Sequence, residues 1–114
     1  MAMVLEPGDK IHIVEHRRFQ EDIRRHFIGE VEAATDQALR ATGYLFLYEK
    51  QAASFTRDDE PRTRVFAIEN TVGITVLPPE TDIDNVAYQR DDKGLAINDR
   101  AGVRFGIGIF GPSG

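Results

Sequence analysis

The sequence predicts an all-β chain that folds as a small barrel or sandwich over residues 1–114. Apolar and polar side chains alternate in several short segments, which is the period of a strand rather than of a helix. Clusters of Gly, Asp and Asn separate these segments at short intervals, as expected of strands joined by tight turns. The length suffices for one hydrophobic core and is too short for two ordinary domains, so we expect a single domain.

The first strands are predicted between residues 10 and 49. Residues 10–14, KIHIV, alternate and are rich in β-branched side chains. Residues 26–34, HFIGEVEAA, place apolar side chains on one face and acidic ones on the other. Residues 43–49, GYLFLYE, are apolar on both faces, which predicts a strand that is covered on both sides.

The second half of the chain continues this pattern. Residues 63–69 and 73–79 are short apolar runs with a turn between them at ENTVG. Three further strands, more than a five-stranded barrel needs, are expected at residues 85–90, 94–99 and 103–110.

The stretch HRRFQEDIRRHF fits either a short helix over residues 17–26 or a hairpin. A helix would align its large apolar residues on one face and set an acidic residue four positions before an arginine, a favourable order. A hairpin with its loop at QED would place Arg18 opposite Arg24 and Arg17 opposite Arg25, and like charges in such positions are unfavourable. The surrounding strands favour the hairpin slightly, and both alternatives stay open.

Composition limits the compartment and the partners. The chain has no cysteine, which excludes disulfides, thiolate nucleophiles and cysteine-bound zinc. The N-terminal sequence does not resemble a signal peptide, and the longest strongly apolar run, YLFLY, is far shorter than the roughly 20 residues of a membrane helix. The net charge of −5 does not attract phosphate backbones over long range. We therefore expect a cytoplasmic protein without membrane contacts.

The segment HIVEH, residues 12–16, has the H-x-x-E-H order of one class of zinc hydrolases. On a strand, however, positions four apart are separated by roughly 13 Å, so His12 and His16 could not share a metal ion. We expect both side chains at the surface or at an edge. In the hairpin alternative His26 would approach His16, as a pair that titrates near pH 6 or binds a metal weakly. No third ligand follows from the spacing, so the sequence predicts no metal and no cofactor.

Other motifs do not indicate catalysis. Residues 106–111, GIGIFG, match the dinucleotide fingerprint G-x-G-x-x-G, but neither a helix nor an acidic residue can follow at the required distance. The aspartates of TDIDN and RDDKG do not have the offsets of a calcium loop. No catalytic residue can be named. This favours a non-enzymatic protein without deciding the question.

The run RVFAIENTVGITVLPP, residues 64–79, resembles the second motif of Sm-like proteins, a strand, a tight turn and a second strand that join subunits into rings. GYLFLYEK and FIGEV resemble the strands of the first motif, so the resemblance covers residues 27–79. It implies a small barrel and a ring. In Sm-like proteins an Asn and an Arg-Gly pair form the RNA pocket, whereas here Ala53 or a neighbour takes the first place and Glu69 and Asn70 take the second.

Three hypotheses of function follow. The leading one is a non-catalytic binding or assembly module that forms a symmetric homo-oligomer, because the short apolar strands leave edges that favour a partner chain. The second is a binder of RNA or single-stranded nucleic acid through the arginine cluster between Arg17 and Arg25, with nucleic acid not the favoured partner. The third is a small-molecule-binding domain or an enzyme, with a pocket lined by aromatic residues: Tyr44, Tyr48, Phe66 and Tyr88. The candidate binding residues are Arg17, Arg18, Arg24, Arg25, His26, Tyr44 and Asn70.

Overall fold

The computed structural model describes residues 4–17, 19, 21–91, 94–99 and 104–106, and within them the fold is all-β, as predicted. Two 3-10 turns accompany the strands, and these residues contain no α-helix. The elements are β1 (Lys10–Glu15), β2 (Arg25–Ala34), β3 (Ala38–Glu49), β4 (Ser54–Arg57), β5 (Arg62–Ala67), η1 (Ile68–Asn70), β6 (Thr71–Val76), η2 (Ile83–Asn85), β7 (Ala87–Asp91), β8 (Gly94–Asn98) and β9 (Arg104–Gly106).

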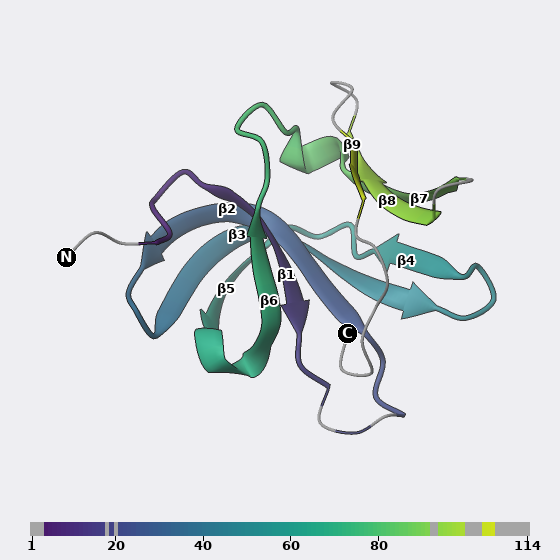
Figure 1. The fold of residues 1–114 in the computed structure, drawn as a ribbon, viewed down its shortest axis with the longest axis horizontal. Coiled ribbons are helices and arrows are strands. Elements are labelled where there is room, and N and C mark those ends of the chain that lie inside the picture. Colours follow the sequence, from purple (N-terminus) through teal and green to yellow (C-terminus); the bar gives the residue numbers. More distant parts are fainter. Residues whose placement is uncertain (1–3, 18, 20, 92–93, 100–103, 107–114) are drawn as a thin grey trace.

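Six strands form one antiparallel sheet (Figure 1). Five of them follow the order β4-β3-β2-β1-β6, and the sixth, β5, pairs with β3. The long strand β3 has two partners on the same side, β5 along residues 38–43 and β4 along residues 46–49. The main sheet therefore ends in β6 on one side and in β4 and β5 on the other. A second sheet, β7-β8-β9, lies beside β4, away from β5 and β6 (Figure 1).

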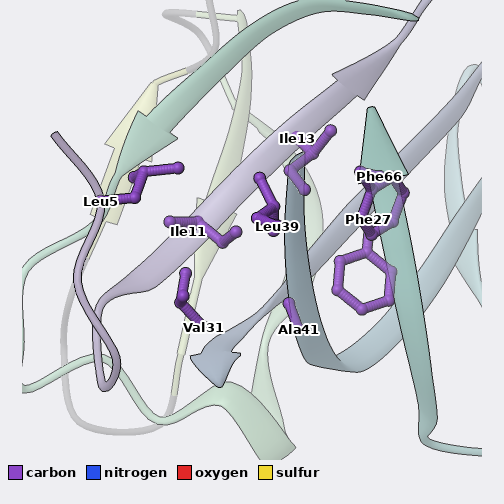
Figure 2. Packing of buried hydrophobic residues seen from close by; sticks show 8 residues of the cluster. All are labelled: Leu5, Ile11, Ile13, Phe27, Val31, Leu39, Ala41 and Phe66. Carbon is purple, nitrogen blue, oxygen red and sulfur yellow. The ribbon is translucent and has the colours of Figure 1, made fainter. Parts of the chain in front are cut away.

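The first core lies on one face of the main sheet. Strand alternation places Ile11 and Ile13 of β1 on the same face as Phe27 and Val31 of β2, and each is almost completely buried. Figure 2 shows these side chains with the rest of the cluster, which is completed by Leu5, Leu39, Ala41 and Phe66.

The second core lies on the opposite face of the same strands. Ile28 of β2 and Phe46 of β3 pack against side chains of the second sheet, among them Tyr88 of β7 and Leu95 and Ile97 of β8. The first core thus covers β3 at Leu39 and Ala41, and the second core covers it at Tyr44, Phe46 and Tyr48. Within residues 43–49 the predicted cover on both faces is not found, because Leu45 and Leu47 are only half-buried and belong to neither core.

Three sequence expectations need correction: the helix, the register of the hairpin and the closed barrel. The helix over residues 17–26 is absent from the part of that stretch that the structure describes; β1 and β2 are instead antiparallel neighbours. The hairpin alternative was right about this pairing but wrong about its register, because His26 lies opposite Val14 and not opposite His16. The connection is therefore longer than the three residues QED. Among the described residues no pairing between β5 and β6 closes the main sheet into a barrel.

Candidate functional site

The predicted arginine cluster does not form one surface. Arg17 donates a hydrogen bond to the carbonyl oxygen of Asp22 (3.5 Å), within the β1–β2 connection. The guanidinium group of Arg24 lies 5.5 Å from the centre of the Tyr48 ring, on the face that carries the second core. Arg25 begins β2 opposite Leu47. Arg18 lies outside the described residues.

Arg25 instead belongs to a hollow of about 610 Å³ that it shares with Arg62 and Arg64 of β5. Carboxylates accompany the β5 arginines: Arg62 lies 3.2 Å from Asp58, and Arg64 lies 3.7 Å from Glu15. These ion pairs reduce the positive potential that the three arginines would otherwise offer to an anion.

The two uncharged candidates lie apart from this hollow and from each other. Tyr44 donates a hydrogen bond to Asp84 (3.0 Å), which raises the pKa of its phenol, and the Arg57 guanidinium lies 4.6 Å from its ring centre. Asn70 ends η1, and its carbonyl oxygen accepts a hydrogen bond from the backbone N–H of His16 (3.0 Å).

The expected aromatic pocket is wrong as a set. Tyr44, Tyr48 and Tyr88 belong to the second core or pack against it, whereas Phe66 lies in the first core, on the other face of the sheet. These four side chains therefore do not line one cavity.

His26 is fully buried and is the centre of a polar cluster that the sequence does not predict. The register between β1 and β2 makes His12 a diagonal neighbour of His26 on the face that the second sheet covers. Tyr88 reaches the same place from β7. His12 Nε2 lies 2.9 Å from His26 Nδ1, His26 Nδ1 lies 2.8 Å from Tyr88 Oη, and Tyr88 Oη lies 3.0 Å from His12 Nε2. We call His12, His26 and Tyr88 the His–His–Tyr cluster.

Aromatic rings surround the His–His–Tyr cluster. The Phe55 ring lies 4.1 Å from the centre of the His26 ring and 4.6 Å from that of Tyr88, and Phe46 packs 4.9 Å from Tyr88. Burial lowers the pKa of His12 to about 4 and raises that of Tyr88 well above its usual value. At neutral pH His12 is therefore an uncharged imidazole and Tyr88 an uncharged phenol.

The expectation that His12 lies at the surface was wrong: its side chain is 4% exposed, although His16 is exposed as expected. The alternation of residues 10–14 places His12 on the face opposite Ile11 and Ile13, and the second sheet covers that face. The sequence predicts Tyr88 only as one of four aromatic residues lining a small-molecule pocket. A signal that could have linked the three residues is their shared chemistry, since buried polar side chains need polar partners.

A second feature of interest is the edge strand β6. Its Val72 and Val76 side chains are 49% and 50% exposed, although Ile74 between them packs against the first core. They line a hollow of about 560 Å³ that is mostly apolar and is also bordered by Val4, Leu5 and Ile68. The first core is thus open to the surface beside β6.

Comparisons with protein-family models, curated proteins and solved structures find no match to this chain. Among the described residues, no group of three His, Cys, Asp or Glu side chains is placed to hold a metal ion. The same part of the chain contains no helix that is long and apolar enough to cross a membrane. The site must therefore be interpreted from its own geometry.

Proposed function

We propose that the protein is a non-catalytic assembly module whose copies join into a symmetric homo-oligomer through the edges of the main sheet. The observation that carries the proposal is the apolar edge strand β6 with its half-exposed valines. No charged residue or proline interrupts Thr71–Val76, although such residues commonly protect an edge from pairing. A strand from a partner would complete the hydrogen bonds of β6 and cover the apolar hollow beside it.

The partner strand that fits best is β5 of a second copy. β5 lies at the other end of the main sheet, and its Val65 side chain is 70% exposed. Pairing β6 of one copy with β5 of the next uses two different surfaces, so every added copy offers a new edge until a ring closes.

The resemblance to Sm-like proteins supports the same arrangement. Its second motif covers residues 64–79, and β5, η1 and β6 occupy most of that segment. In Sm-like proteins the corresponding strands join neighbouring subunits. Among the described residues, β5 and β6 have no strand partner on their outer edges, and such an open sheet is compatible with a barrel that is completed only in the assembled form.

The experiment is a measurement of mass in solution by light scattering behind a sizing column, at low and high salt. We expect a multiple of the 12.8 kDa chain mass that persists at high salt, because an apolar interface is not screened. Val76→Lys should yield the monomer, since a half-exposed position tolerates lysine in the fold but not in a dry interface. Ile23→Lys is the matched control, because Ile23 is 54% exposed in the β1–β2 connection and does not line the hollow beside β6.

A wild-type monomer at high protein concentration would overturn the proposal. Dissociation by Ile23→Lys to the same degree as by Val76→Lys would place the interface elsewhere. Circular dichroism of both variants distinguishes loss of assembly from loss of the fold.

The nucleic-acid alternative is supported by the hollow that contains Arg25, Arg62 and Arg64. It ranks second, because neighbouring carboxylates pair with two of the three arginines and His26 is buried. Arg25→Gln should flatten the salt dependence of binding to single-stranded RNA if this alternative holds. Affinity for RNA no higher than for a polyanion control would remove it.

A further inference from the structure

The geometry of the His–His–Tyr cluster points to a metal site: we propose that His12, His26 and Tyr88 bind one divalent transition-metal ion of zinc type between the two sheets.

The three donor atoms form a nearly regular triangle with sides of 2.9, 2.8 and 3.0 Å. The three ring planes are inclined to one another by 58°, 59° and 63°, so no two of the three rings are stacked. Each ring comes from a different strand, β1, β2 or β7. This is the arrangement of a three-ligand metal site, in which the donor atoms converge on one point.

Hydrogen bonding alone does not account for the triangle. Each imidazole nitrogen carries either one proton or one lone pair in the ring plane, and the phenol carries one proton. Three mutual contacts would require each nitrogen to serve two partners at once, so at most two of the three can be well-formed hydrogen bonds at any moment. A cation at the centre would instead accept a lone pair from all three atoms.

The donor set suits such an ion. Imidazole nitrogens bind Zn²⁺, Cu²⁺ and Fe, and an ionised phenol adds one oxygen ligand. A tetrahedral zinc ion with bonds of about 2.0–2.1 Å holds its ligands roughly 3.3–3.4 Å apart, so the triangle would open by about 0.3–0.6 Å.

Binding is balanced in protons: the ion takes the place of the Tyr88 phenol proton, which is released to solvent, and nothing is oxidised or reduced. A hollow of about 360 Å³ is lined by Tyr88 and by Phe46 and Phe55, which pack against its ring. The bound ion would connect β1 and β2 of the main sheet to β7 of the second sheet.

The first test uses the wild-type chain, stripped of metal with a chelator and then dialysed. Calorimetric titration with Zn²⁺ should give one ion per chain, with release of about one proton. Titration with Co²⁺ should give the visible absorption of a four-coordinate site and shifted proton resonances from His12 and His26. Absence of binding, or shifted resonances from His16 alone, would overturn the proposal.

The second test compares two variants of the full chain. Tyr88→Phe keeps the ring and removes one ligand, and should weaken Zn²⁺ binding by about 100-fold or more. His16→Gln, at the exposed histidine of the same motif, should leave the affinity unchanged. Equal affinity of Tyr88→Phe and wild type would overturn the site. The Co²⁺ resonances of the wild type decide the question even if Tyr88→Phe fails to fold.

Discussion

Gly29 of β2 and Gly43 of β3 lie directly opposite each other on the two long strands of the main sheet. A Cβ atom on Gly29 would lie 2.5 Å from the carbonyl oxygen of Thr42 and 2.7 Å from Cε1 of Phe27. Neither neighbour can move freely, because Thr42 is paired backbone and Phe27 is a fully buried core residue.

We therefore expect Gly29→Ala to lower the free energy of unfolding by about 1–3 kcal/mol, as overpacking of a core does. Urea denaturation followed by circular dichroism measures this change. Gly106→Ala is the control, since among the residues that the structure describes its Cβ would lie near the Arg104 guanidinium alone, at 3.7 Å. Equal stability of Gly29→Ala and wild type would mean that the two strands can separate there without cost.

Single residues were the hardest to predict from the sequence. The alternation in KIHIV correctly separates His12 from Ile11 and Ile13, but it does not tell whether the second face is solvent or another sheet. The contact between His12 and Tyr88 joins residues far apart in the chain, and no local pattern encodes it. His26 was expected to approach His16, whereas the structure makes it a neighbour of His12.

At the scale of elements, strands with a strong alternating or β-branched pattern were predicted well. The segments KIHIV and HFIGEVEAA correspond to β1 and β2, and GITVLPP overlaps β6 over residues 73–76. β6 begins earlier than predicted, inside the expected turn ENTVG. The short strand β4, SFTR, was missed because four mixed residues carry almost no periodicity. The hairpin register was missed because the charged connection between β1 and β2 carries no apolar pattern that could fix it. Most of the last predicted strand, residues 103–110, lies outside the described residues.

At the scale of the whole molecule, the two faces of the main sheet carry the two proposals separately. The hollow beside β6 opens into the first core, whereas the His–His–Tyr cluster lies within the second core. Val76→Lys should therefore abolish assembly without changing metal affinity. The sequence could predict that β3 is rich in apolar side chains, but which of them a core covers depends on long-range packing that one sequence does not encode.

The His–His–Tyr cluster also gives the metal-free protein a dependence of stability on pH. The pKa of His12 is about 4 in the folded chain and about 6.5 in the unfolded chain, so the unfolded state binds a proton that the folded state refuses. Stability from this residue is complete above pH 6.5, falls as the pH decreases toward 4, and changes no further below that. The pKa difference corresponds to a loss of about 3 kcal/mol across this window.

Denaturation in a chelating buffer, from pH 7 to pH 5, measures the slope before most carboxylates titrate. We expect His12→Gln to flatten it, because glutamine stays neutral at every pH, and His16→Gln to leave it unchanged. A slope that is the same in wild type and His12→Gln would show that the buried imidazole of His12 does not cause the dependence of stability on pH. A slope that becomes steeper when excess Zn²⁺ is present at every pH would connect this pH response to the proposed metal site, since the zinc-bound folded state refuses the His12 proton and also lacks the Tyr88 phenol proton, both of which the unfolded state binds.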